Sequence, residues 1–359
     1  MGMEDAPSLL EDRIPDLTST VDLPVRLAAE IDFLAGRVDR WSDPGAQCTP
    51  AVSARSRALL TRPVDARQAL ARVDVATAPI ADIAAAAWAA SRAGGPTVAT
   101  ILERLDAEAS EFLDDGLPIG PRRMYMGLLH AASGDLGLAI DELGKAVVVG
   151  DHRAPLWGAL CRLELGRVLR TAEAVPFDAS SAAPVLTAAR TFFVAGGYRS
   201  LLGRVEHANA PVRATLEVER QSPVSFGVQP EVVIRSSKGL VALRHLVTNG
   251  HRVVTAAELA QVVDGGDGSR IAAMASAAWM SGDTEIDPLD AGASEMIRSM
   301  FFDDTTRSRV TKLLRRTITS LSESHRLMAA HLGASVVTGH GCRYRPAGAA
   351  IQWNEEPSR

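Results

Sequence analysis

The feature that most constrains the fold is a change in hydrophobic period near residue 211. Before it, from Leu23 to about Ala208, apolar residues recur every three or four positions, which is the spacing of helices that bury one face. After Pro211, residues 213–219 alternate apolar and polar side chains, and residues 231–235 are rich in β-branched ones. The intervening residues 222–230 read as a turn or hairpin loop. We therefore expect an all-helical part, a boundary at 209–213, and then a part that mixes strands and helices.

Glycine and proline divide the helical part into segments of roughly 12 to 20 residues, as expected for paired helices with short turns. These breaks fall at 94–96, 116–118, Gly134, Gly150 and 196–197. Between Met124 and Gly150, small residues stand at the positions where two helices of a hairpin must approach each other. They are Gly127, Ala139 and Ala146, with the larger Leu143 between the two alanines. That order resembles the tetratricopeptide repeat of about 34 residues. An irregular helical bundle remains the alternative.

Length and composition set the broad class. A chain of 359 residues is long enough for two domains, and 47% hydrophobic residues exclude disorder for most of it. Three scattered cysteines without a CxxC pair fit a reducing cytoplasm. Residues 1–20 lack the pattern of a signal peptide, and no run of about 18 apolar residues predicts a membrane span. We expect an N-terminal arm at 1–22, a helical domain at 23–210, a second domain at 211–346 with an insertion at 264–302, and a tail at 347–359.

The second domain contains a helix-turn-helix pattern. Leu240, Leu243, Leu246 and Val247 share one face of a first helix, which residues 249–250 end. Thr255 then begins a second helix with Glu258 three residues on, the spacing of a capping box in which each side chain accepts from the other's backbone N–H. A stretch of about 40 residues, 264–302, separates it from the next helix, where a compact motif has a short turn.

The third helix, starting near residues 303–304, has one apolar and one cationic face. Its buried stripe is predicted to be Val310, Leu313, Leu314, Thr317, Ile318 and Leu321. At about 100° per residue, the opposite side carries Ser308, Lys312, Arg315, Arg316 and Thr319, with Arg309 on its flank. A hairpin over residues 335–345 follows, and its returning strand projects Arg343 and Arg345 to one side and Cys342 and Tyr344 to the other.

Charge is strongly segregated along the chain. Residues 305–346 hold eight arginines or lysines against Glu323 alone, a net charge of +7, so the net charge of -5 for the whole chain leaves -12 for the rest. A basic tip on an acidic body is the electrostatic pattern of a phosphate-binding surface.

Residues 234–263 and 309–346, ending in Gly339-His340-Gly341-Cys342-Arg343-Tyr344-Arg345, resemble the winged helix-turn-helix output domains of response regulators and of Streptomyces-type antibiotic regulatory proteins. Over about 120–350 the chain also resembles the C-terminal part of actinobacterial signalling ATPases of the STAND or cyclase-associated kind. The fold class expected is therefore mostly α: a tetratricopeptide-like helical hairpin array followed by an α+β winged helix-turn-helix domain.

This resemblance implies a transcription regulator that binds double-stranded DNA without catalysis or cofactor. The third helix would enter the major groove and the wing a minor groove. Carried over by position, the DNA-contacting residues would be Thr255, Ser308, Arg309, Lys312, Arg315, Arg316, Thr319, Arg343 and Arg345. The resemblance also implies a homodimer, and RNA polymerase or a signalling protein as partner of the helical domain. The apolar residues of the insertion are a candidate dimer or polymerase contact.

Other interpretations stay open. A cationic helix face is often only solvated, and a winged helix can be a protein-docking adaptor in a signalling system instead of a DNA reader. Gly144-Lys145 lacks the earlier glycine and the Ser or Thr of a phosphate loop. His325, His331, His340 and Cys342 match no zinc spacing, so packing or surface roles are expected.

Overall fold

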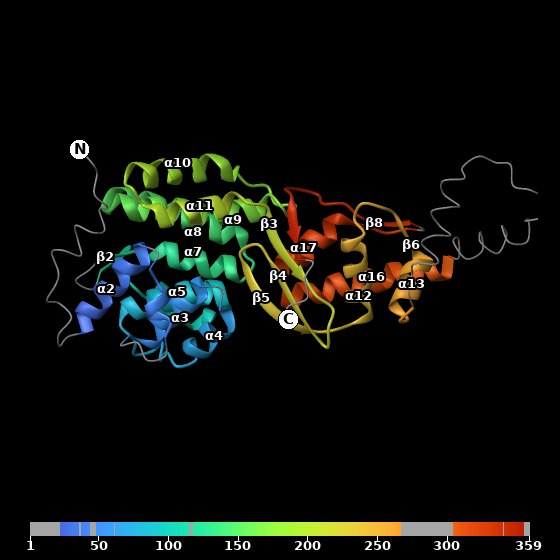
Figure 1. Cartoon of the computed structure of the whole chain (residues 1–359), viewed down its shortest axis with the longest axis horizontal. Coiled ribbons are helices and arrows are strands. Elements are labelled where there is room, and N and C mark those ends of the chain that lie inside the picture. Colours follow the sequence, from blue (N-terminus) through green and yellow to red (C-terminus); the bar gives the residue numbers. More distant parts are fainter. Residues whose placement is uncertain are drawn as a thin grey trace, which may run out of the picture. The chain divides into compact units, whose positions relative to one another are not determined.

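The computed structural model describes residues 22–35, 37–43, 48–60, 62–114, 118–266, 304–339 and 341–354. The fold is mostly helical, with short antiparallel sheets (Figure 1). It divides into two compact units, and the chain passes from the first to the second after Val212. The second unit also takes up Ala174–Pro176, whereas Gly227–Glu231 belong to the first unit. The expected arm apart from Asp22, and almost all of the expected insertion, lie outside the described residues.

The first unit consists mainly of helices connected by short turns. They are α2 (Asp22–Ala35), the 3-10 helix η1 (Asp39–Trp41), α3 (Pro50–Leu59), α4 (Pro63–Leu70), α5 (Ile80–Ala93), α6 (Thr97–Asp106), α7 (Arg122–Ala132), α8 (Leu136–Arg153), α9 (Pro155–Ala172), α10 (Ala182–Ala195) and α11 (Arg199–Asn209). The predicted breaks at 94–96, Gly134 and 196–197 separate α5 from α6, α7 from α8 and α10 from α11. At Gly134 the turn requires a backbone φ of 79°, which glycine adopts without strain.

Two other predicted features of this unit are wrong. The stretch around residues 112–121 is expected to lie in the all-helical part with a helix–helix turn at 116–118, but β1 (Phe112–Asp114) pairs antiparallel with β2 (Pro118–Pro121). Prolines at both ends of β2 disfavour a helix there. Gly150 is not a break but lies inside α8, where a Cβ would come 2.6 Å from the backbone nitrogen of Gly158. Its small size therefore lets α8 and α9 approach closely.

The hairpin α7–α8 has the close contact that its small residues predicted. A Cβ on Gly127 would lie 2.7 Å from Cγ of Leu143, so only glycine fits there without a shift of the neighbour. Ala139, Leu143 and Ala146 are all fully buried in this contact or beside it.

Trp88, in α5, is likewise buried and packs edge-to-face on Phe33 with ring centroids 4.8 Å apart.

The second unit combines a sheet with a cluster of helices. Its elements are β3 (Val212–Leu216), β4 (Gln221–Phe226), β5 (Gln229–Arg235), α12 (Lys238–Thr248), β6 (Val254–Thr255), α13 (Ala256–Val263), α16 (Asp304–Ser324), α17 (Arg326–Ser335), β7 (Val336–Val337), β8 (Gly341–Tyr344) and β9 (Ile351–Trp353). The strand order is β5-β4-β3-β9 in one sheet and β6-β8-β7 in the other.

Three segments of this unit differ from the sequence prediction. Residues 222–230, expected to be a turn or loop, mostly form strand, and the turn itself is confined to the positions around Gly227, which has a φ of 59°. The expected tail contains β9, which pairs with β3 at the edge of the sheet. Just after β9, the Asn354 N–H donates a hydrogen bond of 3.0 Å to the Ala214 carbonyl of β3. Helix α17 occupies residues that carried no separate prediction.

The three helices α12, α13 and α16 pack against one another in all three pairs. Leu240, Leu243 and Leu259 are buried, as are Val310 and Leu314 on α16. Helix α12 approaches α16 so closely at Gly239 that a Cβ there would lie 1.7 Å from Oγ1 of Thr317. Helices α13 and α16 also pack together, even though the sequence separates them by about 40 residues.

Candidate nucleic-acid interface

Helix α16 presents the predicted cationic face. Val310, Leu314 and Leu321 are buried, and Leu313, Thr317 and Ile318 are half-buried, so the apolar stripe faces the unit. The other side is exposed throughout; it carries Ser308, Arg309, Lys312, Arg315, Arg316 and Thr319. The amphipathic pattern therefore places these six predicted residues at the surface.

The hairpin β7–β8 shows the predicted alternation. Val336 pairs with Tyr344 and Val337 with Arg343, and the backbone of β8 also pairs with β6. Cys342 is fully buried and Tyr344 is 4% exposed, whereas Arg343 and Arg345 are exposed. Strand β6 leads directly into α13, which packs on α16, so a continuous set of elements connects the two groups of arginines.

Ion pairs distinguish two kinds of cation on this surface. Asp264 Oδ2 lies 3.1 Å from the Arg309 guanidinium and its Oδ1 lies 2.9 Å from Nζ of Lys238. The pKa of the Asp264 carboxyl is lowered. The largest cause is the hydrogen bond from Lys238, and the positive charge of Lys238 and the hydrogen bond from Arg309 add to it. Within the described residues, by contrast, no carboxylate pairs with Lys312, Arg315, Arg316, Arg343 or Arg345. These five, named here the free cations, thus have no ion-pair partner in the part of the chain that the structure describes.

Thr255 departs from its predicted role. Its side chain is 4% exposed, and its Oγ1 accepts a hydrogen bond of 3.1 Å from the Glu258 N–H at the start of α13. A buried hydroxyl engaged in this way cannot contact a DNA phosphate. Thr255 acts as an N-cap that fixes where α13 begins.

Only half of the predicted capping box forms. The Glu258 carboxylate does not return to the Thr255 N–H; it is 1% exposed and accepts from His245 Nε2 at 2.9 Å and from the Arg252 guanidinium. Burial alone would raise the pKa of Glu258, but the hydrogen bonds from Arg252 and His245 outweigh burial and lower it. This cluster connects α12 to α13 through their side chains.

A buried hydrogen-bond relay fixes the hairpin to α17, which sequence reasoning did not foresee. The Ala174 carbonyl can only accept, so His331 donates from Nδ1 at 2.7 Å. His331 Nε2 then accepts from the Tyr344 hydroxyl at 2.8 Å, and the Tyr344 oxygen accepts from Trp353 Nε1 at 3.1 Å. Burial lowers the pKa of His331, against a smaller opposing effect of the bond to Ala174. The relay therefore holds a neutral histidine.

Further observations bear on the other candidate chemistries. Gly144 and Lys145 lie inside α8, not in a loop. Among the described residues, no three His, Cys, Asp or Glu side chains are grouped to hold a metal ion. No helix within the described ranges is long and apolar enough to cross a membrane.

Comparison of the chain with models of protein families, with curated proteins and with solved structures finds no match. The functional argument therefore rests on the residues and geometry of this chain.

Proposed function

We propose that this chain is a DNA-binding transcription regulator whose second unit is a winged helix-turn-helix. The observation that carries the proposal is the set of free cations, Lys312, Arg315, Arg316, Arg343 and Arg345, exposed on α16 and the β7–β8 hairpin. Their charge stands out because the chain outside residues 305–346 is acidic overall. Five exposed cations with no carboxylate partner among the described residues suit the phosphates of a nucleic acid.

The shape of the surface favours duplex DNA among nucleic acids. An α-helix fits the major groove of B-DNA, and α16 is exposed along the length that carries Ser308, Lys312, Arg315 and Thr319. Arginine can bond guanine O6 and N7 with two donors, so Arg315 and Arg316 are the candidates for base contacts, while Lys312 suits a phosphate. Arg343 and Arg345 on the hairpin would enter the adjacent minor groove.

The first unit supplies the regulatory part of the proposal. Its stacked helical hairpins, with the close α7–α8 contact at Gly127, are of a kind that offers extended surfaces to peptides or proteins. A signalling protein or RNA polymerase bound there would connect a signal to the DNA-binding unit. A homodimer on two half-sites is the expected form on DNA.

The test is binding of the full chain to labelled fragments of its own upstream region, followed by fluorescence anisotropy. The variant is Arg315→Ala/Arg316→Ala, and the matched control is Arg213→Ala/Arg220→Ala, which removes two exposed arginines near β3. We expect the α16 variant to lose binding by at least about 100-fold, from two charge-assisted contacts, and the control to bind like the wild type. Equal binding by both variants, or no binding at low salt, would instead indicate a protein-docking module.

A further inference from the structure

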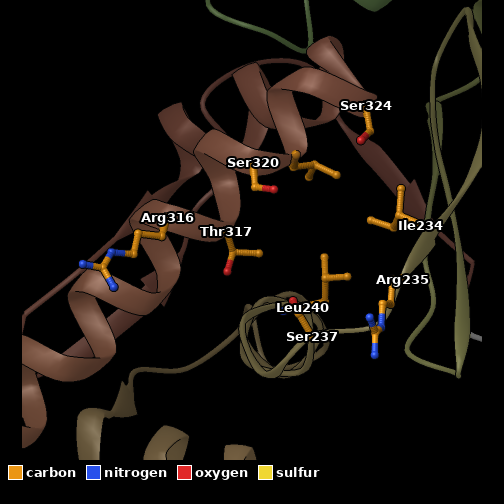
Figure 2. Close-up of a pocket in the computed structure, with 9 residues that line it drawn as sticks. Ile234, Arg235, Ser237, Leu240, Arg316, Thr317, Ser320 and Ser324 are labelled. Carbon is orange, nitrogen blue, oxygen red and sulfur yellow. Dashed lines mark hydrogen bonds between the residues drawn. The ribbon is translucent and has the colours of Figure 1, made fainter.

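The second unit contains a cavity of about 400 Å³ beside the cationic face of α16. It lies between the end of β5, the start of α12 and the C-terminal half of α16 (Figure 2). Ile234, Leu240 and Leu321 form its apolar part. A volume of this order is at the lower end for small-molecule sites, which are largely apolar with a few placed polar groups.

Hydroxyl groups supply the polar part. Ser320 and Ser324 project toward the cavity in Figure 2, and no hydrogen bond to another described residue engages either hydroxyl. The Ser237 oxygen accepts from the Leu240 N–H at 3.3 Å as the N-cap of α12, which leaves its hydroxyl hydrogen to donate. Three hydroxyl donors therefore surround one small volume.

Two arginines flank the cavity and bring positive charge to its rim. Arg235 and Arg316 stand on opposite sides of it in Figure 2, both exposed. Neither forms an ion pair within the described part of the chain, and no Asp or Glu is among the lining residues. Their guanidinium groups point outward, but an exposed arginine can turn toward an anion through a change of rotamer. Hydroxyl groups and positive charge thus lie around the cavity, and no carboxylate is among its lining residues.

We infer that this cavity is an effector site for a small organic phosphate with a short apolar group. The phosphate oxygens would accept from the Ser320 and Ser324 hydroxyls and from Arg235 and Arg316, since guanidinium and phosphate form strong charge-assisted bonds. The apolar group would rest on Leu240 and Leu321.

Regulation follows from the position of Arg316, and this step rests on the proposed DNA binding. Arg316 belongs both to the lining of the cavity and to the cationic face of α16. A guanidinium that holds the effector is no longer available to DNA. Occupancy of the cavity therefore weakens DNA binding by about tenfold, the effect of losing one charge-assisted contact.

Saturation-transfer difference NMR on the full chain tests the site without DNA, with n-butyl phosphate as the probe at constant ionic strength. n-Butanol is the uncharged control ligand. Ser320→Leu, which removes a hydroxyl and fills the cavity, has Ser322→Leu as its control on the same helix, because Ser322 does not line the cavity. Arg235→Gln has Arg220→Gln as its control, an exposed arginine elsewhere in the same unit.

The wild type and both controls should bind n-butyl phosphate, Ser320→Leu should not, and Arg235→Gln should bind about tenfold more weakly. The inference would be overturned if n-butanol bound as tightly as n-butyl phosphate. It would also be overturned if Ser320→Leu bound n-butyl phosphate as tightly as the wild type does. With DNA present, butyl phosphate should release DNA from the wild type but not from Ser320→Leu. If Ser320→Leu loses DNA binding in the absence of the probe, the cavity holds a DNA phosphate and is not an effector site. Probe binding without any DNA binding would leave the site intact and refute the proposed function.

Discussion

Replacing His331 with phenylalanine should destabilise the second unit strongly, and more at neutral than at acidic pH. The ring stacks on Phe226 at a centroid distance of 5.0 Å, and phenylalanine can keep that stacking. What it loses is both ring nitrogens. The Ala174 carbonyl then has no donor and the Tyr344 hydroxyl no acceptor, with both residues buried. A buried polar group left without a partner costs about 1–3 kcal/mol, so the two together give roughly 2–6 kcal/mol.

The pH dependence follows from the lowered pKa of His331. Burial holds the folded-state pKa below the unfolded value of 6.5, so the unfolded chain binds the proton first as the pH falls. The wild type keeps the full contribution of this residue above that value. It loses up to about 1.4 kcal/mol per pH unit below it, until the folded-state pKa is reached. The destabilisation by His331→Phe should therefore shrink between pH 7.5 and pH 5.

Urea unfolding followed by circular dichroism, with hydrogen exchange of the α17 amides to report on the second unit, measures both effects. Tyr344→Phe provides a double-mutant cycle. Because each change removes a partner of the other, the double variant should be less destabilised than the sum of the two single variants. Additive effects, or the same loss from His331→Phe at both pH values, would refute the relay.

Four further predictions concern other positions. Glu258→Gln should cost about 1–3 kcal/mol in urea unfolding, because it weakens the charge-assisted hydrogen bonds to the partly exposed Arg252 and to His245; an unchanged stability would contradict this. Gly127→Val should lower stability by about 1–3 kcal/mol through its clash with Leu143. Gly144→Ala, at a helix position with open space, should raise stability by about 0.5–1 kcal/mol, and a loss there would overturn the packing argument. Asp264→Asn should tighten DNA binding in anisotropy by releasing Arg309 and Lys238, whereas unchanged affinity would place those cations outside the interface.

Periodicity was sufficient for the parts of the fold where one local signal dominates. The amphipathic pattern of α16 correctly predicted which side of the helix is buried, and the alternation over 342–345 correctly predicted which arginines are exposed. Glycine also correctly predicted the end of a helix at Gly134, because the backbone there needs a positive φ.

The sequence-based predictions were wrong where the conformation or bonding of a residue is determined by a contact with a residue distant in the sequence. Gly150 has the composition of a helix break, yet its purpose is the approach of Gly158 on the next helix. The Thr255–Glu258 spacing predicted a reciprocal box, but Arg252 and His245 compete for the same carboxylate. Strand β9 is too short to be recognised locally, and it forms because β3, far earlier in the chain, offers it a partner.

The cavity could not have been predicted from sequence at all. Arg235, Ser320 and Ser324 are separated by up to 89 positions in the numbering and share no motif. They converge because α12 approaches α16 closely at Gly239 and Thr317.

The most direct test of the central claim is the salt dependence of DNA affinity. Each phosphate contacted by a cation contributes about -0.9 to the slope of log K against log salt concentration. The five free cations on α16 and the hairpin predict a slope of up to about -4.5 per protomer, and Arg343→Ala/Arg345→Ala should make it shallower by up to about 1.8. A slope near zero, or one that these substitutions leave unchanged, would show that the cationic surface does not bind DNA.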